Sequence, residues 1–516
     1  WGEFAASGAG PRCRFAMAQG LFSNKMPSWS DICLDLRALA VFRFALGVAS
    51  LVEIMELMLY HDAFLEKTGV CPVSRISHTS RIDLYLTSMV PIWLLLVTNF
   101  VAALAFTLGF RSQLSAVICW LFAASQHHRL SNCVEYGGDH LRSHLFFWSL
   151  FQPLGHAWSL DTFLQRQHPE KTRSNQQDSL APTSPSILGS CGSRTQVASL
   201  EEGSYPEKNK ALRNTEAPLS TFLILLQMAS MYTFTASTKT GETWTSGIAV
   251  YQTMHISHFA RQPAASILAM FPEICRIFTH ATLYIEWYGW LLAFFPSQLA
   301  RMMAFGMFSA LHIGMYLTLR VGNFSIFVIS GWCIALPGCV LDKMEMWLHH
   351  RWPRSVQLLS IQSTPKSEAM KPSRLMMNML GITLMALCLA DSQMALQDLV
   401  KDLGFSKILT ELDLKQHYSM FSPDVPQYSL RVHVFGILAS PKCNEAVEAY
   451  WMHCDVAELW INGLPSFTAD NEKLEKWPNL TAPGKHKTLD FATNRWRKVV
   501  EKREHSKAIG PYICRK

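Results

Sequence analysis

The sequence predicts an all-α membrane protein, a polytopic bundle of about eight or nine transmembrane helices with a small C-terminal lumenal α+β cap. Of its 516 residues, 49% are hydrophobic and only 16% are charged, against roughly 25% charged residues in an average soluble protein. The hydrophobic residues are also concentrated in blocks, and a helix needs about 20 mostly apolar residues to cross a bilayer. The net charge of +7 is too small and too dispersed to indicate a nucleic-acid partner. The lipid bilayer is therefore the expected partner, and no protein partner is indicated.

Nine apolar segments are the candidates for these helices, and two or three of them are short enough to be re-entrant or interfacial. In chain order they are Ala38–Tyr60, Val90–Phe110, Leu114–Ser125, Leu141–Gly155, Leu219–Ala236, Ala281–Phe295, Met303–Leu319, Asn323–Leu341 and Leu375–Ala390. Residues 1–30 contain no clear signal peptide because Arg12, Arg14 and Lys25 interrupt any apolar core. We expect these residues to form a cytosolic tail.

Basic residues predict on which side of the membrane each connection lies. Residues 165–217 are polar, rich in Ser, Pro and Gln, and basic, so we expect a flexible cytosolic linker between two half-bundles, 31–164 and 218–392. The stretch after Leu341 is also basic. Counting nine spans from a cytosolic N-terminus then places Ser237–Ile274 and the C-terminal domain, 393–516, in the lumen.

Two features of the lumenal segments agree with an endoplasmic reticulum membrane. Asn479-Leu480-Thr481 is a glycosylation sequon, and cysteines are expected in an oxidising lumen. In the C-terminal domain, Tyr428–Leu438 alternates like a strand pair and Arg495–Arg503 is typical of a basic helix. The cysteines predicted to be lumenal are Cys71, Cys133, Cys443, Cys454 and Cys514.

Polar residues inside predicted spans are expensive and are therefore functional candidates. Arg43, Glu53 and Glu56 lie in the first span, where an internal network that fixes packing is a more ordinary role than substrate binding. His312 lies in the middle of a later span. It could donate to a neighbouring carbonyl or to Glu286, or it could accept a proton, since burial favours the neutral ring.

Lys239 follows Tyr232 and Ala236 on one helix face, at the predicted lumenal end of an apolar span. Its amine could simply extend to the aqueous interface and mark the helix end. Alternatively, an apolar pocket could keep the amine neutral and make it a general base. Glu242, three residues later, would oppose this by holding the lysine charged.

Histidine pairs raise a di-iron alternative, because membrane desaturases use about eight histidines on one side of the bilayer to hold two metals. The pairs are His140/His144, His255/His258 and His349/His350. The first two pairs are predicted to be lumenal and the third cytosolic, so they cannot meet. No metal site is expected.

Short sequence motifs spread over residues 35 to 500 resemble those of the horizontally transferred transmembrane (HTTM) domain family, whose best-known members are the vitamin K-dependent gamma-carboxylases. No single motif is specific to the family, and the resemblance rests on the order and spacing of the motifs. They are Leu39–Gly47, Gly137–Asp139, Pro153–Asp161, Tyr232–Lys239, Trp244–Gly247, Glu286, Asn323–Ser325, Met420–Pro423 and Arg495–Arg497.

The resemblance implies roles for individual residues. Lys239 is similar to the family's catalytic lysine, five residues before a tryptophan as there, and Tyr232 to a tyrosine that precedes it. His156 resembles the histidine of the His-x-Trp-Ser motif, and His312 another functional histidine. The implied catalytic residues are therefore Lys239, His156, Tyr232 and His312, and the implied cofactor-binding residues are Trp158, Trp244 and Glu286.

The implied activity is that of a quinol-dependent oxygenase that uses reduced vitamin K or a related hydrophobic hydroquinone with O2 and CO2. A neutral lysine would deprotonate the hydroquinone, which ends as an epoxide, and His156 would stabilise the oxyanion. Two departures argue against carboxylation of protein substrates: Thr238 replaces the first lysine of the family's doublet, and only residues 393–516 follow the last span. The alternative is a non-catalytic HTTM scaffold or a lipid- or quinone-binding protein.

Overall fold

A computed structural model describes residues 34–167, 221–351 and 372–426 with short gaps, and also residues 435–437, 456–458, 460–461, 464–465 and 494–501. This part of the chain is mostly helical, which confirms the helical part of the prediction, whereas the α+β cap stays a prediction. Its short strands form two antiparallel pairs, β1 (Phe435–Ile437) with β2 (Val456–Glu458), and β3 (Trp460–Ile461) with β4 (Leu464–Pro465). Most of the predicted lumenal cap, including Asn479 and Cys443, lies outside the described residues.

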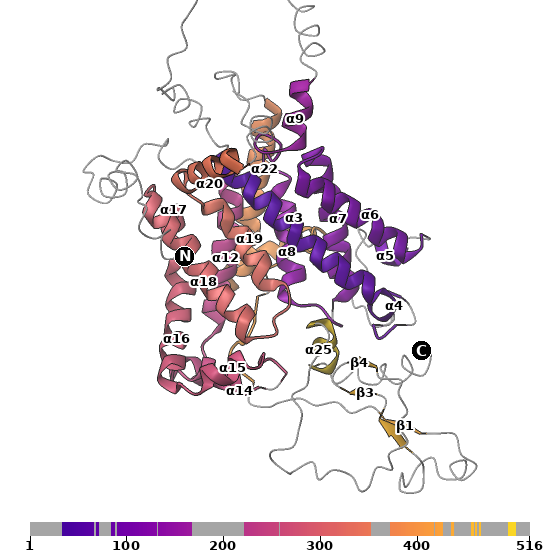
Figure 1. Ribbon diagram of the computed structural model, residues 1–516, viewed down its shortest axis with the longest axis vertical. Coiled ribbons are helices and arrows are strands. Elements are labelled where there is room, and N and C mark those ends of the chain that lie inside the picture. The colour runs from indigo at the N-terminus through magenta and orange to yellow at the C-terminus, as the bar shows by residue number, and fades with distance from the viewer. Residues whose placement is uncertain are drawn as a thin grey trace, which may run out of the picture.

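The helices form an elongated bundle with short helices at both ends (Figure 1). The first half contains α3 (Leu36–Leu59), α4 (His61–Phe64), α5 (Leu84–Thr87), α6 (Ile92–Leu108), α7 (Ser112–Leu130), α8 (Gly137–Ser149) and α9 (Leu160–Gln167). The second half contains α12 (Phe222–Thr238), α13 (Glu242–Thr245), α14 (Ala249–His255), α15 (Ala264–Ala269), α16 (Pro272–Tyr284), the π-helix η3 (Ile285–Gly289), α17 (Leu291–Phe294), α18 (Gln298–Thr318), α19 (Phe324–Trp332), the 3-10 helix η4 (Cys333–Ala335), α20 (Gly338–Arg351) and α22 (Pro372–Ser392). Helices α23 (Met394–Asp402), α24 (Phe405–Glu411) and α25 (Asn494–Glu501) follow.

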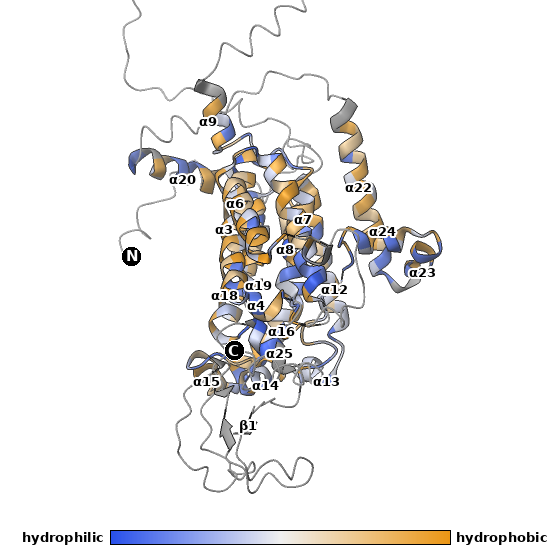
Figure 2. Cartoon of the chain, turned by 90° about the vertical axis from the view of Figure 1, so that its right-hand side faces the viewer, coloured by the Kyte–Doolittle hydropathy of each residue, from blue (hydrophilic) through white to orange (hydrophobic). Residues whose placement is uncertain are grey.

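Two described helices, Leu36–Leu59 and Leu375–Ser392, are long and apolar enough to cross a membrane. A third span results if Phe324–Ala335 and Gly338–Leu348, which bend by 101°, are counted together. The other apolar blocks do not meet both conditions: α8 has 13 residues, the block Ala281–Phe295 contains the π-helix η3, and α7 and α18 are long enough, with 19 and 21 residues, but less apolar. Figure 2 shows hydrophobic residues along much of the bundle. The larger count of eight or nine spans stays a prediction.

Different short helices lie at the two ends of the bundle. In Figure 1, α9 and α20 lie at the upper end, and α14, α15 and α25 lie at the lower end. Helix α3 runs between the two ends and packs closely on α6. This contact requires Gly47, because a Cβ at that position would lie 2.1 Å from Thr107 Oγ1. Small residues at such crossings allow helices in membranes to approach.

A buried network of charges ties α25 to the lower end of the bundle. Glu53 of α3 accepts hydrogen bonds from Tyr136 Oη at 2.6 Å and from Asn323 Nδ2 at 2.7 Å, and it also pairs with Arg495 of α25. Arg495 donates to both carboxylate oxygens of Asp139, at 2.6 and 3.0 Å. Glu53 therefore belongs to an internal network, as expected for the first span.

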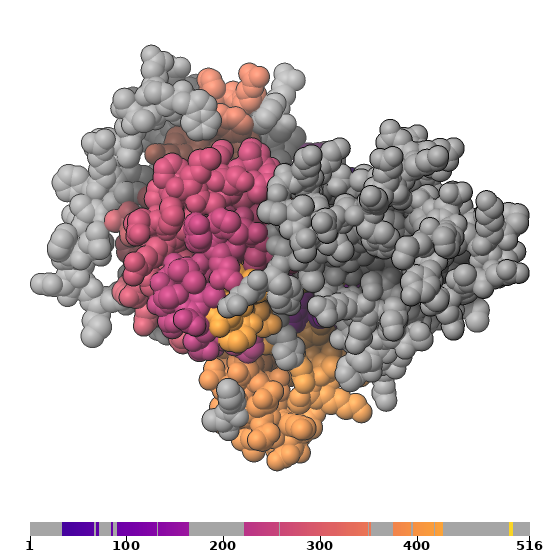
Figure 3. Space-filling view, turned by 90° about the horizontal axis from the view of Figure 1, so that it is seen from below, coloured from indigo at the N-terminus to yellow at the C-terminus, as the bar shows by residue number. Residues whose placement is uncertain are grey.

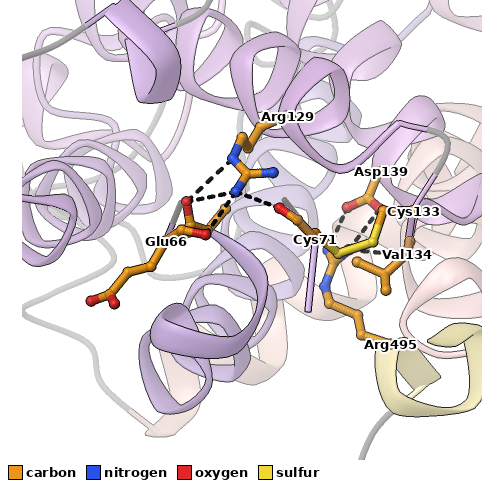
Figure 4. The surroundings of a disulfide bond; sticks show 8 residues. Glu66, Cys71, Arg129, Cys133, Val134, Asp139 and Arg495 are labelled. Carbon is orange, nitrogen blue, oxygen red and sulfur yellow. Dashed lines mark hydrogen bonds and ion pairs between the residues drawn. A yellow bond between two sulfur atoms is a disulfide. The ribbon is translucent and has the colours of Figure 1, made fainter. Parts of the chain in front are cut away.

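A disulfide between Cys71 and Cys133 lies near this network (Figure 4). Arg129 of α7 braces the loop that carries Cys71 by donating to the carbonyl oxygens of Leu65, Glu66 and Cys71 at 2.8, 3.1 and 2.9 Å. The disulfide joins two segments that were both predicted to be lumenal. A disulfide is typical of an oxidising compartment.

Replacing Arg495 by Met tests the role of the network. The change leaves Glu53 and Asp139 buried without their cation, so the free energy of unfolding should fall by about 3–5 kcal/mol. The measurement is the thermal unfolding of the protein in detergent. Lys401→Met, at an exposed position of α23, is the matched control and should change stability by less than about 0.5 kcal/mol. Equal unfolding curves for the two variants would contradict the role of Arg495.

Candidate functional site

A cavity of about 910 Å³ lies at the lower end of the bundle. Helices α7 and α12 end at this cavity, and α8 and α19 begin there. The segment after α24 and the helix α25 complete the wall. Seen from below, the magenta segment around α13–α15 lies beside the orange segment that follows α24 (Figure 3). Five of the seven predicted site residues line the cavity: Tyr232, Lys239, Trp244, Glu286 and His312.

Lys239 lies at the C-terminal end of α12 and forms an ion pair with Glu286. Its Nζ is 2.7 Å from both carboxylate oxygens, and the two side chains are only 5% and 8% exposed. Nζ also lies 4.4 Å from the centre of the Trp244 ring. The carboxylate that holds Lys239 is therefore Glu286 rather than the nearby Glu242, which was considered from the sequence.

Glu286 lies in the π-helix η3 (Ile285–Gly289). A π-turn inserts an extra residue into a helix and shifts the side chains that follow, and such turns are frequent at functional sites. The turn ends at Gly289, where a Cβ would lie 2.4 Å from Met307 Cε. Glu286 and Lys239 belong to different helices, 47 residues apart in the sequence, and no local sequence pattern links them.

Tyr232 and His312 form a second contact in the cavity wall. The Tyr232 hydroxyl lies 2.7 Å from His312 Nε2. The Tyr232 ring packs on Phe308 with a centroid distance of 4.3 Å. His312 thus takes Tyr232 as its partner, instead of the carbonyl or Glu286 considered from the sequence, and the contact fixes the orientation of both rings.

His156 and Trp158, two of the predicted site residues, do not line this cavity. Arg43 of α3 donates to the carbonyl oxygens of Leu154 and Trp158, both at 2.6 Å. Arg43 precedes Glu53 by ten residues, or about 15 Å along the helix, so this loop lies toward the upper end. His156 cannot stabilise an oxyanion formed beside Lys239 at the lower end. The His-x-Trp-Ser motif suggested roles for these two residues, but it contains no information about where they lie in the bundle.

Three cavity residues that the sequence did not single out, His127, Asp413 and Tyr418, form a cluster with His140. His127 Nδ1 lies 2.6 Å from Asp413 Oδ1. His140 stacks between His127 and Tyr418, with centroid distances of 4.8 and 5.0 Å. Burial alone would raise the pKa of the Asp413 carboxyl, but the adjacent His127 lowers this pKa below its usual range. Asp413 and Tyr418 come from an irregular segment nearly 300 residues later, and no local pattern links them to the histidines.

The described residues contain no group of three or more His, Cys, Asp or Glu side chains placed to hold a metal ion. His144, which was considered with His140 as part of a metal box, has the Tyr418 hydroxyl 2.9 Å from its Nδ1. His140 and His144 therefore take part in ring stacking and hydrogen bonding.

Comparisons of the sequence with protein-family models and with curated proteins, and of the fold with solved structures, find no match.

The Lys239–Glu286 pair can be tested by a double-mutant cycle. Lys239→Met and Glu286→Gln each break a buried pair, and Lys239→Met leaves a buried carboxylate uncompensated, so thermal stability in detergent should fall by about 3–5 kcal/mol. The double variant should lose less than the sum of the two single variants, because the second change removes the stranded partner. Lys407→Met, at an exposed position of α24, is the control. Additive losses would show that the two side chains do not interact.

Proposed function

We propose that this chain is a membrane protein similar to the vitamin K-dependent gamma-carboxylases, and that it binds a hydroquinone in the lower cavity as a quinol-dependent oxygenase or epoxidase. Little or no protein carboxylation is proposed. The observation that carries the proposal is the buried Lys239–Glu286 pair facing a cavity of about 910 Å³. Ionisable residues in an apolar bundle are costly to retain and cluster at functional sites.

The ion pair changes how the base would work. Glu286, rather than a neutral Lys239, would accept the proton of the hydroquinone hydroxyl. The Lys239 ammonium would then stabilise the oxyanion, because solvent only weakly screens the attraction between two charges that lie close together in a buried site. The chemistry supplied by a bound reduced vitamin K would be the reduction of O2, with the epoxide and water as products. Trp244, whose ring lies next to Lys239 Nζ, would pack against the ligand ring.

The ion pair also favours a second candidate, a non-catalytic lipid- or quinone-binding protein. Lys239 Nζ already has two carboxylate oxygens at 2.7 Å, so its charge is satisfied without a substrate. A buried pair of this kind can serve structure or ligand recognition alone. The two candidates share the cavity and differ in whether a bound hydroquinone is oxidised.

The same proposal includes eight or nine spans in the endoplasmic reticulum membrane, with the C-terminal domain in the lumen. The membrane location is supported by the pair of apolar helices long enough to span a bilayer, or three with the bent pair. The Cys71–Cys133 disulfide lies near Arg495 of the C-terminal helix α25 (Figure 4). The disulfide agrees with a lower end that faces an oxidising lumen.

Epoxide formation separates the two candidates. The protein, purified and placed in lipid nanodiscs, is supplied with reduced short-chain vitamin K, O2 and CO2, and the epoxide is measured by chromatography. Glu286→Gln should lower the rate by about 100-fold or more, because it removes the proton acceptor. Lys239→Met should lower it as well, and Lys407→Met should not.

Each outcome of this experiment has a distinct meaning. Hydroquinone binding without epoxide in the wild-type protein would select the non-catalytic binder. Neither binding nor epoxide would contradict both candidates. Equal rates of epoxide formation for wild type and Glu286→Gln would show that the ion pair takes no part in the mechanism.

The position of His156 gives a separate prediction about ligand binding. Because His156 lies away from the cavity, His156→Ala should leave the dissociation constant of the hydroquinone within about twofold of wild type. His312→Ala removes the hydrogen-bond partner of Tyr232 and should weaken binding by about tenfold. Equilibrium dialysis measures both constants. The reverse order of effects would show that the ligand site lies at the upper end.

A further inference from the structure

Helices α23 and α24, which follow α22, share an exposed apolar face. A helix turns by about 100° per residue, so leucines three, four and seven positions apart lie on one side of α23. These are Leu396, Leu399 and Leu403, with exposed fractions of 44%, 55% and 61%. Lys401 lies about 200° around the helix from Leu399 and is also exposed. Helix α24 adds two exposed apolar side chains, Phe405 and Ile408.

Helix α22 places this face relative to the bilayer. It contains the candidate membrane span Leu375–Ser392, only 28% of which is buried inside the protein, so most of its surface is available to lipid. Helix α23 begins at Met394, two residues after α22 ends, and packs against it. Figure 2 shows α23 and α24 projecting sideways from the lower end of α22. The exposed leucines therefore lie where the chain leaves the bilayer.

The charges of the two helices indicate what kind of surface covers this face. Acidic and basic residues nearly balance, and they are Asp398, Lys401, Asp402, Lys407 and Glu411. Such a balance gives no strong attraction to an anionic surface, so burial of apolar side chains has to supply the binding. A helix with one apolar and one polar face that turns sideways at the end of a span matches a helix lying in the membrane interface.

Another side of α24 belongs to the cavity. Leu409 and Thr410 line the cavity, as does Asp413 just after the helix. Leu409 is fully buried, and Asp413 holds His127. A single short helix therefore separates the exposed apolar face from the cavity, so the surface that covers this face also fixes the position of this part of the cavity wall.

We infer that α23 and α24 form an interfacial membrane anchor. Their apolar face lies at the boundary between headgroups and acyl chains in the leaflet nearer the lower end, and its partner is a zwitterionic lipid surface. The anchor holds α24 against the cavity and thereby positions Asp413. The inference goes beyond the proposed function, because it needs the membrane location but no particular ligand or reaction.

Photo-crosslinking from single positions tests the anchor. The photoreactive amino acid p-benzoylphenylalanine is introduced at Leu399 on the apolar face, at Lys401 as the matched control, and at Leu380 of α22, which is 48% exposed, as the positive control for lipid contact. Each full-length variant is placed in phosphatidylcholine vesicles and irradiated. Intact-protein mass spectrometry detects an added lipid, and a denaturing gel detects a crosslinked dimer. All three positions are exposed, and thermal unfolding checks that each variant is folded.

The Leu399 variant should form a phosphatidylcholine adduct in a yield similar to that of the Leu380 variant. The Lys401 variant should form about tenfold less, because only one side of α23 faces lipid.

Four results would overturn the inference. The first is equal adduct yields at Leu399 and Lys401, and the second is no adduct at Leu399 when Leu380 forms one. The third is a crosslinked dimer at Leu399 in place of the lipid adduct, which would assign the face to contact between two copies of the chain. The fourth is no adduct at either Leu399 or Leu380, which would also exclude α22 as a span. The first three leave the hydroquinone site untouched, so they are distinct from a failure of the proposed function.

Discussion

The cost of burying charge governs the lower end of this protein. An isolated charge in an apolar interior is strongly disfavoured, so a buried ionisable group must be paired or neutral. Glu53 meets this constraint through Arg495, and Lys239 meets it through Glu286. Arg495 attaches the C-terminal helix α25 to the bundle, and α25 forms part of the cavity wall. The pairing that closes the fold therefore also shapes the site.

The same constraint decides how the site can work. A lysine base must lose its proton, yet a carboxylate 2.7 Å away stabilises the ammonium. Activity is easier to reconcile with Glu286 as the proton acceptor and Lys239 as the stabilising cation. A ligand that binds beside Lys239 and Glu286 without displacing either would contact both the ammonium and the carboxylate. Catalysis and simple binding are thus two uses of one arrangement.

Parts of this arrangement could be predicted from the sequence, and the reasons for the failures are physical. Apolar blocks predict helices because burial and composition are local properties, and Lys239 with Tyr232 was placed correctly because both lie on one helix. His156 was assigned to the site from a short motif, which does not specify its distance from Lys239, and it lies in the connection between α8 and α9. Glu286 reaches Lys239 across a sequence separation of 47, and Asp413 reaches His127 across one of 286. Neither leaves a periodic signal.

The central claim is that the Lys239–Glu286 pair faces a ligand that fills the lower cavity. A cryo-electron microscopy map of the protein in nanodiscs, prepared with reduced short-chain vitamin K under nitrogen, tests it most directly. The account predicts density for a flat ring beside Trp244, with one edge at Lys239 and Glu286. Density for the ring elsewhere, or a cavity occupied by the protein's own side chains with Lys239 in water, would contradict it.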